Sequence, residues 1–315
     1  MSSATKLELL GLHHITAIAS DPKRNRDFYT RVLGLRFVKQ SVNQDDPGTY
    51  HLYYGDYHGS PGSALTFFPW AGVRRGRPGH GQAYATAFSV PADALAFWQR
   101  RLAELDVETA PLEKRFSDDV LTLFDPDGLR LELIATAETD VRTPAPSADV
   151  PAEFAIRGFH STTLGVIEDG ATGALLTDTM GYRRSAQSGH RTRYQTGAGG
   201  PGRYVDLLAD PALPRGLHRA GTVHHVAFRV PDEAAEEKSH SLLLERGLGV
   251  SPVIDRAYFK SIYYREPSGI LFEIATDQPG FAIDEPVESL GSRLSLPPRL
   301  EPFRADIEKA LPKLA

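Results

Sequence analysis

The chain has 315 residues, of which 41% are hydrophobic and 24% charged, with a formal net charge of −5 and no cysteine. This composition is typical of a soluble globular protein of about two domains, and no apolar run approaches the roughly 20 residues of a membrane span. The lack of cysteine excludes disulfides, thiolate metal sites and cysteine nucleophiles, and the acidic balance argues against nucleic acid as a partner. The N-terminus lacks the features of a secretory signal, so we expect a cytoplasmic protein without membrane association.

The first predicted elements, within residues 9–70, are one strand, one helix and three further strands. The helix is predicted over 23–33, because Asp21 can cap a helix and Pro22 can open one, whereas Gly34 can end it. The flanking apolar runs are bounded by turn-forming Asp, Pro and Gly residues, as strands usually are. The predicted strands cover about 13–19, 36–40, 50–54 and 64–68.

This βαβββ pattern returns three times along the chain. The clearest match joins FDPDGLRLELIAT in the second unit to REPSGILFEIAT in the fourth. Internal repetition of this kind predicts a fold built from copies of one supersecondary unit. The four units cover about 9–70, 82–139, 154–211 and 220–277.

The segments between the strands and units are predicted to be connectors. The Gly-rich run 197–202 lies between two strand-like segments, so it predicts a hairpin connection and not a nucleotide-binding loop. Residues 72–81 are interpreted as a solvated connector. A segment rich in Pro, Ala and Asp at 139–153 is predicted to divide the chain into domains 7–140 and 152–280. The tail, 281–315, contains one short amphipathic helix that is predicted to dock on the domains or to form a dimer contact.

Two distant strands carry a His-His pair at the same phase, GLHHITAIA from Gly11 and TVHHVAFRV from Thr222. Side chains alternate between the two faces of a strand, so His14 and His225 point away from the apolar face that a helix covers. Glu273 interrupts an otherwise apolar strand, and a buried carboxylate needs a partner. We therefore expect His14, His225 and Glu273 to meet on one divalent metal.

Comparison of the four units indicates which of them carry this site. Ala85 and Ser161 stand at the histidine position in units two and three, so these units lack that ligand. The carboxylate position is held by Glu132, Asp206 and Thr66 in units two, three and one. Only units one and four together supply two histidines and a carboxylate, which requires them to share a barrel. Three protein ligands of this kind are typical of non-heme Fe(II) sites with open positions.

At these residues the chain resembles the vicinal oxygen chelate superfamily, which includes glyoxalase I and type I extradiol dioxygenases. The resemblance rests on GLHHIT, FYTRVLGLRFVKQSVN, YHLYYGD, GSPGSALTFFP, RGFHS, HHVAF and GILFEIATDQPGF, in this order. Within this superfamily the chain most resembles ring-cleaving dioxygenases that open hydroquinones. It implies an α+β fold of four βαβββ modules in two tandem domains that form paired, incompletely closed barrels.

The resemblance also implies Fe(II), or Mn(II) or another divalent metal, with His14, His225 and Glu273 as ligands. It implies catalytic or supporting roles for five further residues, which are His13, His224, Thr16, Arg256 and Tyr263. Strand phase turns His13 and His224 away from the metal unless a bulge intervenes. The expected function is an Fe(II)-dependent, extradiol-type ring-cleaving dioxygenase acting on hydroquinone- or catechol-like aromatics with O₂.

Two other functions are alternatives at this point. A glyoxalase-type isomerase normally uses four ligands, and Thr66 in place of a carboxylate argues against it. The second alternative is a metal-free resistance protein that binds and sequesters an aromatic compound. The expected partners are a small aromatic substrate and O₂, and a homo-oligomer is left open. No role is assigned to the remaining histidines, which are His51, His58, His80, His190, His218 and His240.

Overall fold

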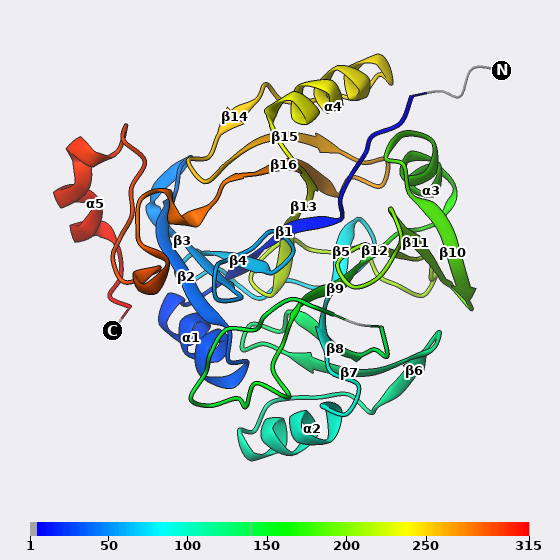
Figure 1. The fold of residues 1–315 in the computed structure, drawn as a ribbon, viewed down its shortest axis with the longest axis horizontal. Helices are drawn as coiled ribbons and strands as arrows, with labels where there is room; N and C mark the ends of the chain where they lie inside the picture. Colours follow the sequence, from blue (N-terminus) through cyan, green and yellow to red (C-terminus); the bar gives the residue numbers. More distant parts are fainter. Residues whose placement is uncertain (1–4, 139, 315) are drawn as a thin grey trace.

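The structure is a computed structural model that describes residues 5–138 and 140–314, and it consists of two curled eight-stranded sheets with few helices (Figure 1). The predicted α+β fold of βαβββ modules in incompletely closed half-barrels is confirmed. The domain boundaries at 7–140, 152–280 and 281–315 stay a prediction. No helix in the described ranges is long and apolar enough to cross a membrane.

The first sheet is built from units one and four, in the strand order β14-β15-β16-β13-β1-β4-β3-β2. The expectation that the outermost units share one barrel is therefore confirmed, and their strands lie side by side in Figure 1. Unit one contains β1 (Leu12–Ala19), α1 (Pro22–Asp27), β2 (Arg36–Asn43), β3 (Asp46–Gly55) and β4 (Ala64–Pro69). Unit four contains β13 (Thr222–Val230), α4 (Glu233–Glu245), β14 (Ile254–Asp255), β15 (Phe259–Arg265) and β16 (Leu271–Pro279).

The second sheet combines units two and three, in the order β10-β11-β12-β9-β5-β8-β7-β6. Unit two contains β5 (Gln82–Val90), α2 (Leu95–Glu104), β6 (Glu113–Arg115), β7 (Asp118–Phe124) and β8 (Arg130–Ala135). Unit three contains β9 (Gly158–Gly165), α3 (Gly170–Ala174), β10 (Arg183–Ser188), β11 (Arg191–Gln195) and β12 (Tyr204–Leu208). Residues 197–202 join β11 to β12, which pair antiparallel, so the predicted hairpin connection is confirmed.

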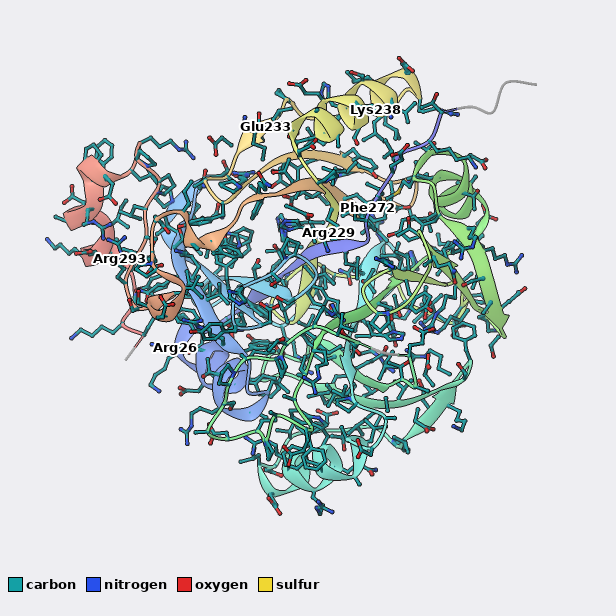
Figure 2. The ribbon with its side chains drawn as sticks, viewed as in Figure 1. Arg26, Arg229, Glu233, Lys238, Phe272 and Arg293 are labelled. Atoms are coloured by element: carbon teal, nitrogen blue, oxygen red, sulfur yellow. The ribbon has the colours of Figure 1, made fainter. Side chains whose placement is uncertain are left out.

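In the first sheet α1 packs on β3, and α4 packs on β15 and β16. α1 is continued by a π-helical turn, Phe28–Val32, and the predicted helix over 23–33 corresponds to the two together. The Asp21 side chain caps α1 by accepting a hydrogen bond from the Arg24 backbone N–H at 2.7 Å. Figure 2 shows the charged Glu233 and Lys238 of α4 at the periphery and the fully buried Phe272 of β16 in the interior. The opposite, concave face of the first sheet carries polar side chains among aromatic ones.

The C-terminal tail docks on the outer edge of the first sheet, one of its two predicted positions. Its helix is α5 (Arg304–Ala310), preceded by short 3₁₀ turns at Phe281–Ile283, Val287–Ser289 and Glu301–Phe303. The Ser295 N–H donates to the Gln40 carbonyl at 2.8 Å, so the tail covers the exposed edge of β2. The fully buried Lys39 ammonium lies between Asp284, at 2.6 Å, and Glu285.

We expect the Glu285→Ala variant to lose about 3 kcal/mol of unfolding free energy, because Lys39 keeps only the partly exposed Asp284 as counter-charge. Urea unfolding monitored by circular dichroism measures the loss. Glu301→Ala removes a surface ion pair with Arg304 and should cost less than about 1 kcal/mol. Equal losses in the two variants would contradict a buried ionic contact between tail and sheet.

A second buried carboxylate predicts a pH-dependent stability. Glu236 on α4 is 1% exposed, and neither of its carboxylate oxygens has a hydrogen-bond partner in the described ranges. Burial, together with the charge of Glu273, raises its pKa from 4.5 to about 7. The folded protein therefore binds this proton more tightly than the unfolded chain, and stability falls as the pH rises from about 4.5 to 7.

Glu236→Gln should remove this dependence. We expect the variant to exceed the wild-type unfolding free energy by about 3 kcal/mol at pH 8 and to match it near pH 4.5. Urea unfolding of both proteins across this pH range checks the sign, and an unchanged difference at all pH values would count against it.

Candidate metal centre and its pocket

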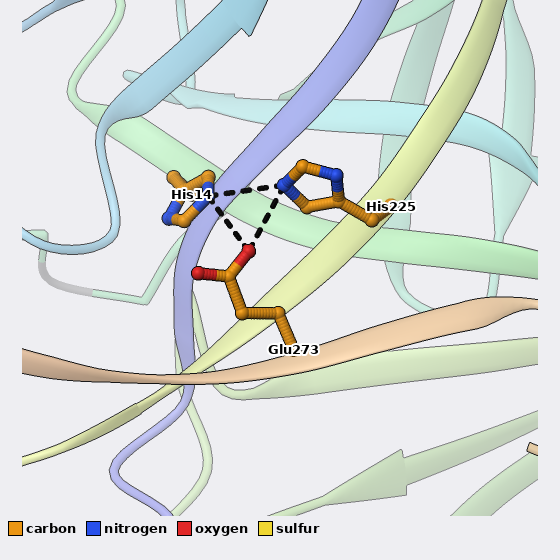
Figure 3. A group of neighbouring side chains, drawn as sticks. All are labelled: His14, His225 and Glu273. Carbon is orange, nitrogen blue, oxygen red and sulfur yellow. Dashed lines mark hydrogen bonds and ion pairs between the residues drawn. The ribbon is translucent and has the colours of Figure 1, made fainter. Parts of the chain in front are cut away.

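Three adjacent strands at the centre of the first sheet bring together His14, His225 and Glu273 (Figure 3). The Glu273 Oε2 atom lies 3.0 Å from His225 Nε2 and 3.3 Å from His14 Nε2, and the two imidazole nitrogens are 3.3 Å apart. All three side chains are buried, at 0 to 5% exposure. The structure thus places the three predicted ligands around one point, and their role as ligands stays a prediction.

A chain of hydrogen bonds sets the proton positions on the first imidazole. His13 Nε2 lies 3.1 Å from the Thr276 carbonyl oxygen, which can only accept, so this nitrogen carries a proton. Burial, aided by His14, lowers the pKa of His13 to about 3, so the ring is neutral and its Nδ1 is an acceptor. His14 Nδ1, at 2.8 Å, must then donate to it. With its Nδ1–H engaged by His13, His14 has Nε2, which faces Glu273, as the nitrogen that can bind a cation.

Burial and neighbouring groups set the charge states of His225 and Glu273. Burial lowers the pKa of His225 against the opposing effect of Glu273, which favours the neutral ring. Burial on its own would raise the pKa of Glu273, but His14 and His225 hold it well below its usual range. Neither Glu273 oxygen has a hydrogen-bond partner among the described residues. If both imidazoles carry their proton on Nδ1, the three groups turn only lone pairs toward one point, an arrangement that a divalent cation would balance.

The spacing of the donor atoms fits a divalent metal. Bonds of about 2.1 Å at right angles place neighbouring ligand atoms about 3.0 Å apart. The observed separations of 3.0 to 3.3 Å match one face of such an arrangement. Two imidazoles and one carboxylate are the facial ligand set of non-heme Fe(II) sites, although Mn(II) and other divalent ions accept it too.

Two β-bulges decide where the neighbouring histidines point. The β1–β13 pairing shifts register between Leu12 and His14, and again where Thr16 pairs with His225 and Ala17 with Val223. His13 and His224 are the extra residues at these shifts. In a regular strand both side chains would point away from the metal face, but the bulges turn each ring toward the histidine that follows it. His13 Nδ1 and His224 Nδ1 lie 2.8 Å from Nδ1 of His14 and of His225, respectively.

A cavity of about 310 Å³ opens beside His14 and His225, two of the three predicted ligands. Its walls combine aromatic rings with polar side chains, which is typical of a site for a small ligand. Of the five residues predicted to have catalytic roles, His224, Arg256 and Tyr263 line it, whereas His13 and Thr16 lie behind the cavity wall. The lining residues are His14, Asn43, Gln44, Asp45, His51, Tyr53, Phe68, Trp70, His224, His225, Arg256, Phe259, Tyr263 and Leu271.

Arg256 and Tyr263 form one polar corner of the cavity. The Arg256 Nε–H donates to the Tyr263 hydroxyl at 3.1 Å, and Ser261 Oγ donates to the same oxygen at 3.0 Å. Burial, and next the charge of Glu273, raise the pKa of Tyr263, so the phenol is neutral at pH 7. With two donors on its oxygen, the hydroxyl keeps its own proton for a ligand in the cavity.

His51 belongs to the cavity, although the sequence indicated no role for it. Its Nε2 lies 2.9 Å from Thr66 Oγ1, and its Nδ1 lies 2.7 Å from the Tyr53 hydroxyl. Thr66 in turn contacts Thr16 at 2.7 Å. Thr66 and its hydrogen-bond partners occupy the place in unit one that Glu273 occupies in unit four. The alternation of His51 and Tyr53 on a strand facing Thr66 was the signal that could have found it.

Comparisons with known proteins agree with this geometry. The family model of the Glyoxalase/Bleomycin resistance protein/Dioxygenase superfamily matches residues 11–133 and 158–274. "Putative ring-cleaving dioxygenase MhqO" of Bacillus subtilis is 46% identical over 302 residues, which are 96% of each chain. The chlorohydroquinone/hydroquinone 1,2-dioxygenase of Sphingobium indicum is 33% identical over 312 residues, covering 96% of this chain and 95% of that protein.

Solved structures show the same architecture. The crystal structure of a "putative dioxygenase" from Bacillus subtilis superimposes with a TM-score of 0.94 at 45% identity and covers 99% of both chains. Glyoxalase I from Zea mays, at 14% identity, superimposes with a TM-score of 0.63 over 85% of this chain and 92% of that one, which shows the shared fold alone. The chain therefore belongs to the glyoxalase, bleomycin resistance protein and dioxygenase superfamily.

Proposed function

We propose that the protein is an Fe(II)-dependent dioxygenase that opens the ring of hydroquinone- or catechol-like aromatics with O₂. The observation that carries this proposal is the convergence of His14, His225 and Glu273 at an aromatic-lined cavity whose wall includes the two histidines. The names of the relatives support it, because one of them acts on chlorohydroquinone and hydroquinone. In hydroquinone the hydroxyls are para, so cleavage at a 1,2 bond lies beside a single hydroxyl.

His14, His225 and Glu273 would hold the metal. Bound there, Fe(II) would supply a Lewis acid and the electron transfer that allows O₂ to react with a closed-shell ring. The cavity of about 310 Å³ is at the lower end of the range for ligand pockets, which suits a single aromatic ring. Phe68, Trp70 and Phe259 provide apolar walls that can orient such a ring beside the ligands.

The polar side chains of the cavity can manage charge on the substrate oxygen. The Arg256 guanidinium favours the phenolate over the phenol by electrostatic attraction. The Tyr263 hydroxyl can donate a hydrogen bond to it. Burial, and next His225, lower the pKa of His224 to about 3, so this ring is neutral. If His225 uses Nε2 as a ligand, its Nδ1 donates to His224 Nδ1, and His224 Nε2 is left as a donor toward the cavity.

The two alternative functions have less support. An isomerase with four ligands would need a carboxylate at Thr66, and Thr66 is instead hydrogen-bonded to Thr16 and His51. A metal-free binding protein would have only two buried imidazoles to balance the buried carboxylate of Glu273, and burying a charge is costly.

The wild-type protein, purified under mild anaerobic conditions, should bind one Fe(II) or Mn(II) per chain. At a free metal concentration 100-fold above Kd, binding should raise the unfolding free energy by about 2.7 kcal/mol, and removal with a chelator should reverse the gain. We expect His225→Ala to lower the affinity about 100-fold, and the exposed His190→Ala to leave it unchanged. Titration followed by thermal unfolding measures both, and equal affinity of His225→Ala and wild type would refute the ligand assignment.

One experiment separates the three functions. We expect the protein, reconstituted anaerobically with Fe(II), to consume O₂ with hydroquinone or catechol and to form a ring-opened product, measured with an oxygen electrode and mass spectrometry. Methylglyoxal with a thiol should cause no turnover. Conversion of that mixture without O₂ would identify an isomerase, and binding of the aromatics without O₂ uptake would identify a binding protein.

A further inference from the structure

Units two and four carry the same arginine and glutamate at equivalent positions. The same number of residues separates Arg115 from Glu132 and Arg256 from Glu273. The residue after each arginine has a positive φ, 54° at Phe116 and 72° at Ala257. The sheet registers agree as well, because Thr122 pairs with Glu132 on β8 as Tyr263 pairs with Glu273 on β16. The backbones of Arg115 and Arg256 therefore occupy equivalent positions relative to Glu132 and Glu273.

In unit two the arginine itself supplies the cation. Arg115 Nη1 and Nη2 donate to the two Glu132 oxygens at 2.5 and 2.9 Å, and both side chains are buried. Ala85 and Ser161 occupy the positions where the first sheet has its histidines. The guanidinium thus neutralises the carboxylate at the place that corresponds to the metal centre.

In unit four the equivalent arginine is held away from its carboxylate. Arg256 Nε donates to the Tyr263 hydroxyl at 3.1 Å, and Nη1 donates to Asp45 Oδ2 at 3.3 Å. Its guanidinium carbon lies 5.2 Å from the centre of the Tyr263 ring. Glu273 has no hydrogen-bond partner among the described residues. The position that holds the small Thr122 in unit two holds this tyrosine in unit four.

We propose that Arg256 is an internal cation that competes with the metal for Glu273, and that Tyr263 is a positioning residue that prevents this. Asp45, which comes from unit one, adds a second contact that keeps the guanidinium at the cavity wall. Tyr263 thereby sets the affinity of the metal centre, apart from any contact with substrate. This inference rests on the metal-dependent function proposed above.

Tyr263→Thr reproduces the residue of unit two and tests the inference without turnover. We expect the affinity for Mn(II), measured from the electron paramagnetic resonance signal of the free ion, to fall at least tenfold, because Arg256 can then reach Glu273. The double variant Tyr263→Thr/Arg256→Met should return to within about threefold of wild type. Arg256→Met alone should bind Mn(II) at least as tightly as wild type.

Tyr263→Phe keeps the aromatic packing and serves if the threonine variant does not fold. It should lose affinity at least threefold and regain it when combined with Arg256→Met. A tyrosine variant that binds Mn(II) like wild type, or a double variant that stays as weak as the tyrosine variant, would overturn the inference and leave the proposed function intact. Absence of Mn(II) and Fe(II) binding by the wild type would instead refute the proposed function.

Discussion

The rest of the structure depends on a negative charge in the middle of a sheet. Glu273 is fully buried, and a buried carboxylate is costly unless a cation or several hydrogen bonds compensate it. Glu132 poses the same problem in the second sheet, where Arg115 solves it within the chain. Around Glu273 the chain provides two imidazoles and keeps its arginine at a distance. The same physical constraint is thus met by an arginine in one sheet and, in our proposal, by a bound metal in the other.

The candidate metal centre also requires the two ends of the fold to meet. His14 and His225 are 211 residues apart in sequence, and they become neighbours because β1 and β13 pair antiparallel. Contacts of such sequence separation carry a high loop-closure cost, so the centre assembles only when the first and last units have joined. The tail braces β2 at the edge of that same sheet through Lys39. The three predicted ligands lie on central strands, which hold their side chains more rigidly than loops do.

The paired histidines show how one extra residue changes the function of a strand. In a regular strand His13 and His224 would face the covering helices, and the bulges turn each ring toward the adjacent ligand. His13 then links the Thr276 carbonyl to His14 and sets the tautomer that leaves a lone pair for a cation. The second histidine of each pair, His14 or His225, is a candidate ligand. The first, His13 or His224, shares a proton with its Nδ1 atom.

The sequence by itself determined the βαβββ units, the pairing of the first with the last, and the three converging residues. Strand and helix periods are local, and comparison of the repeats shows which positions have kept a histidine or a carboxylate. The tertiary structure alone decided the bulges at His13 and His224, the contact of His51 with Thr66, and the cavity walls from Trp70 and Gln44. It also decided the position of Arg256, which depends on Asp45 in another unit. These features arise where side chains from distant segments compete for the same partners, and no local period in the sequence records that competition.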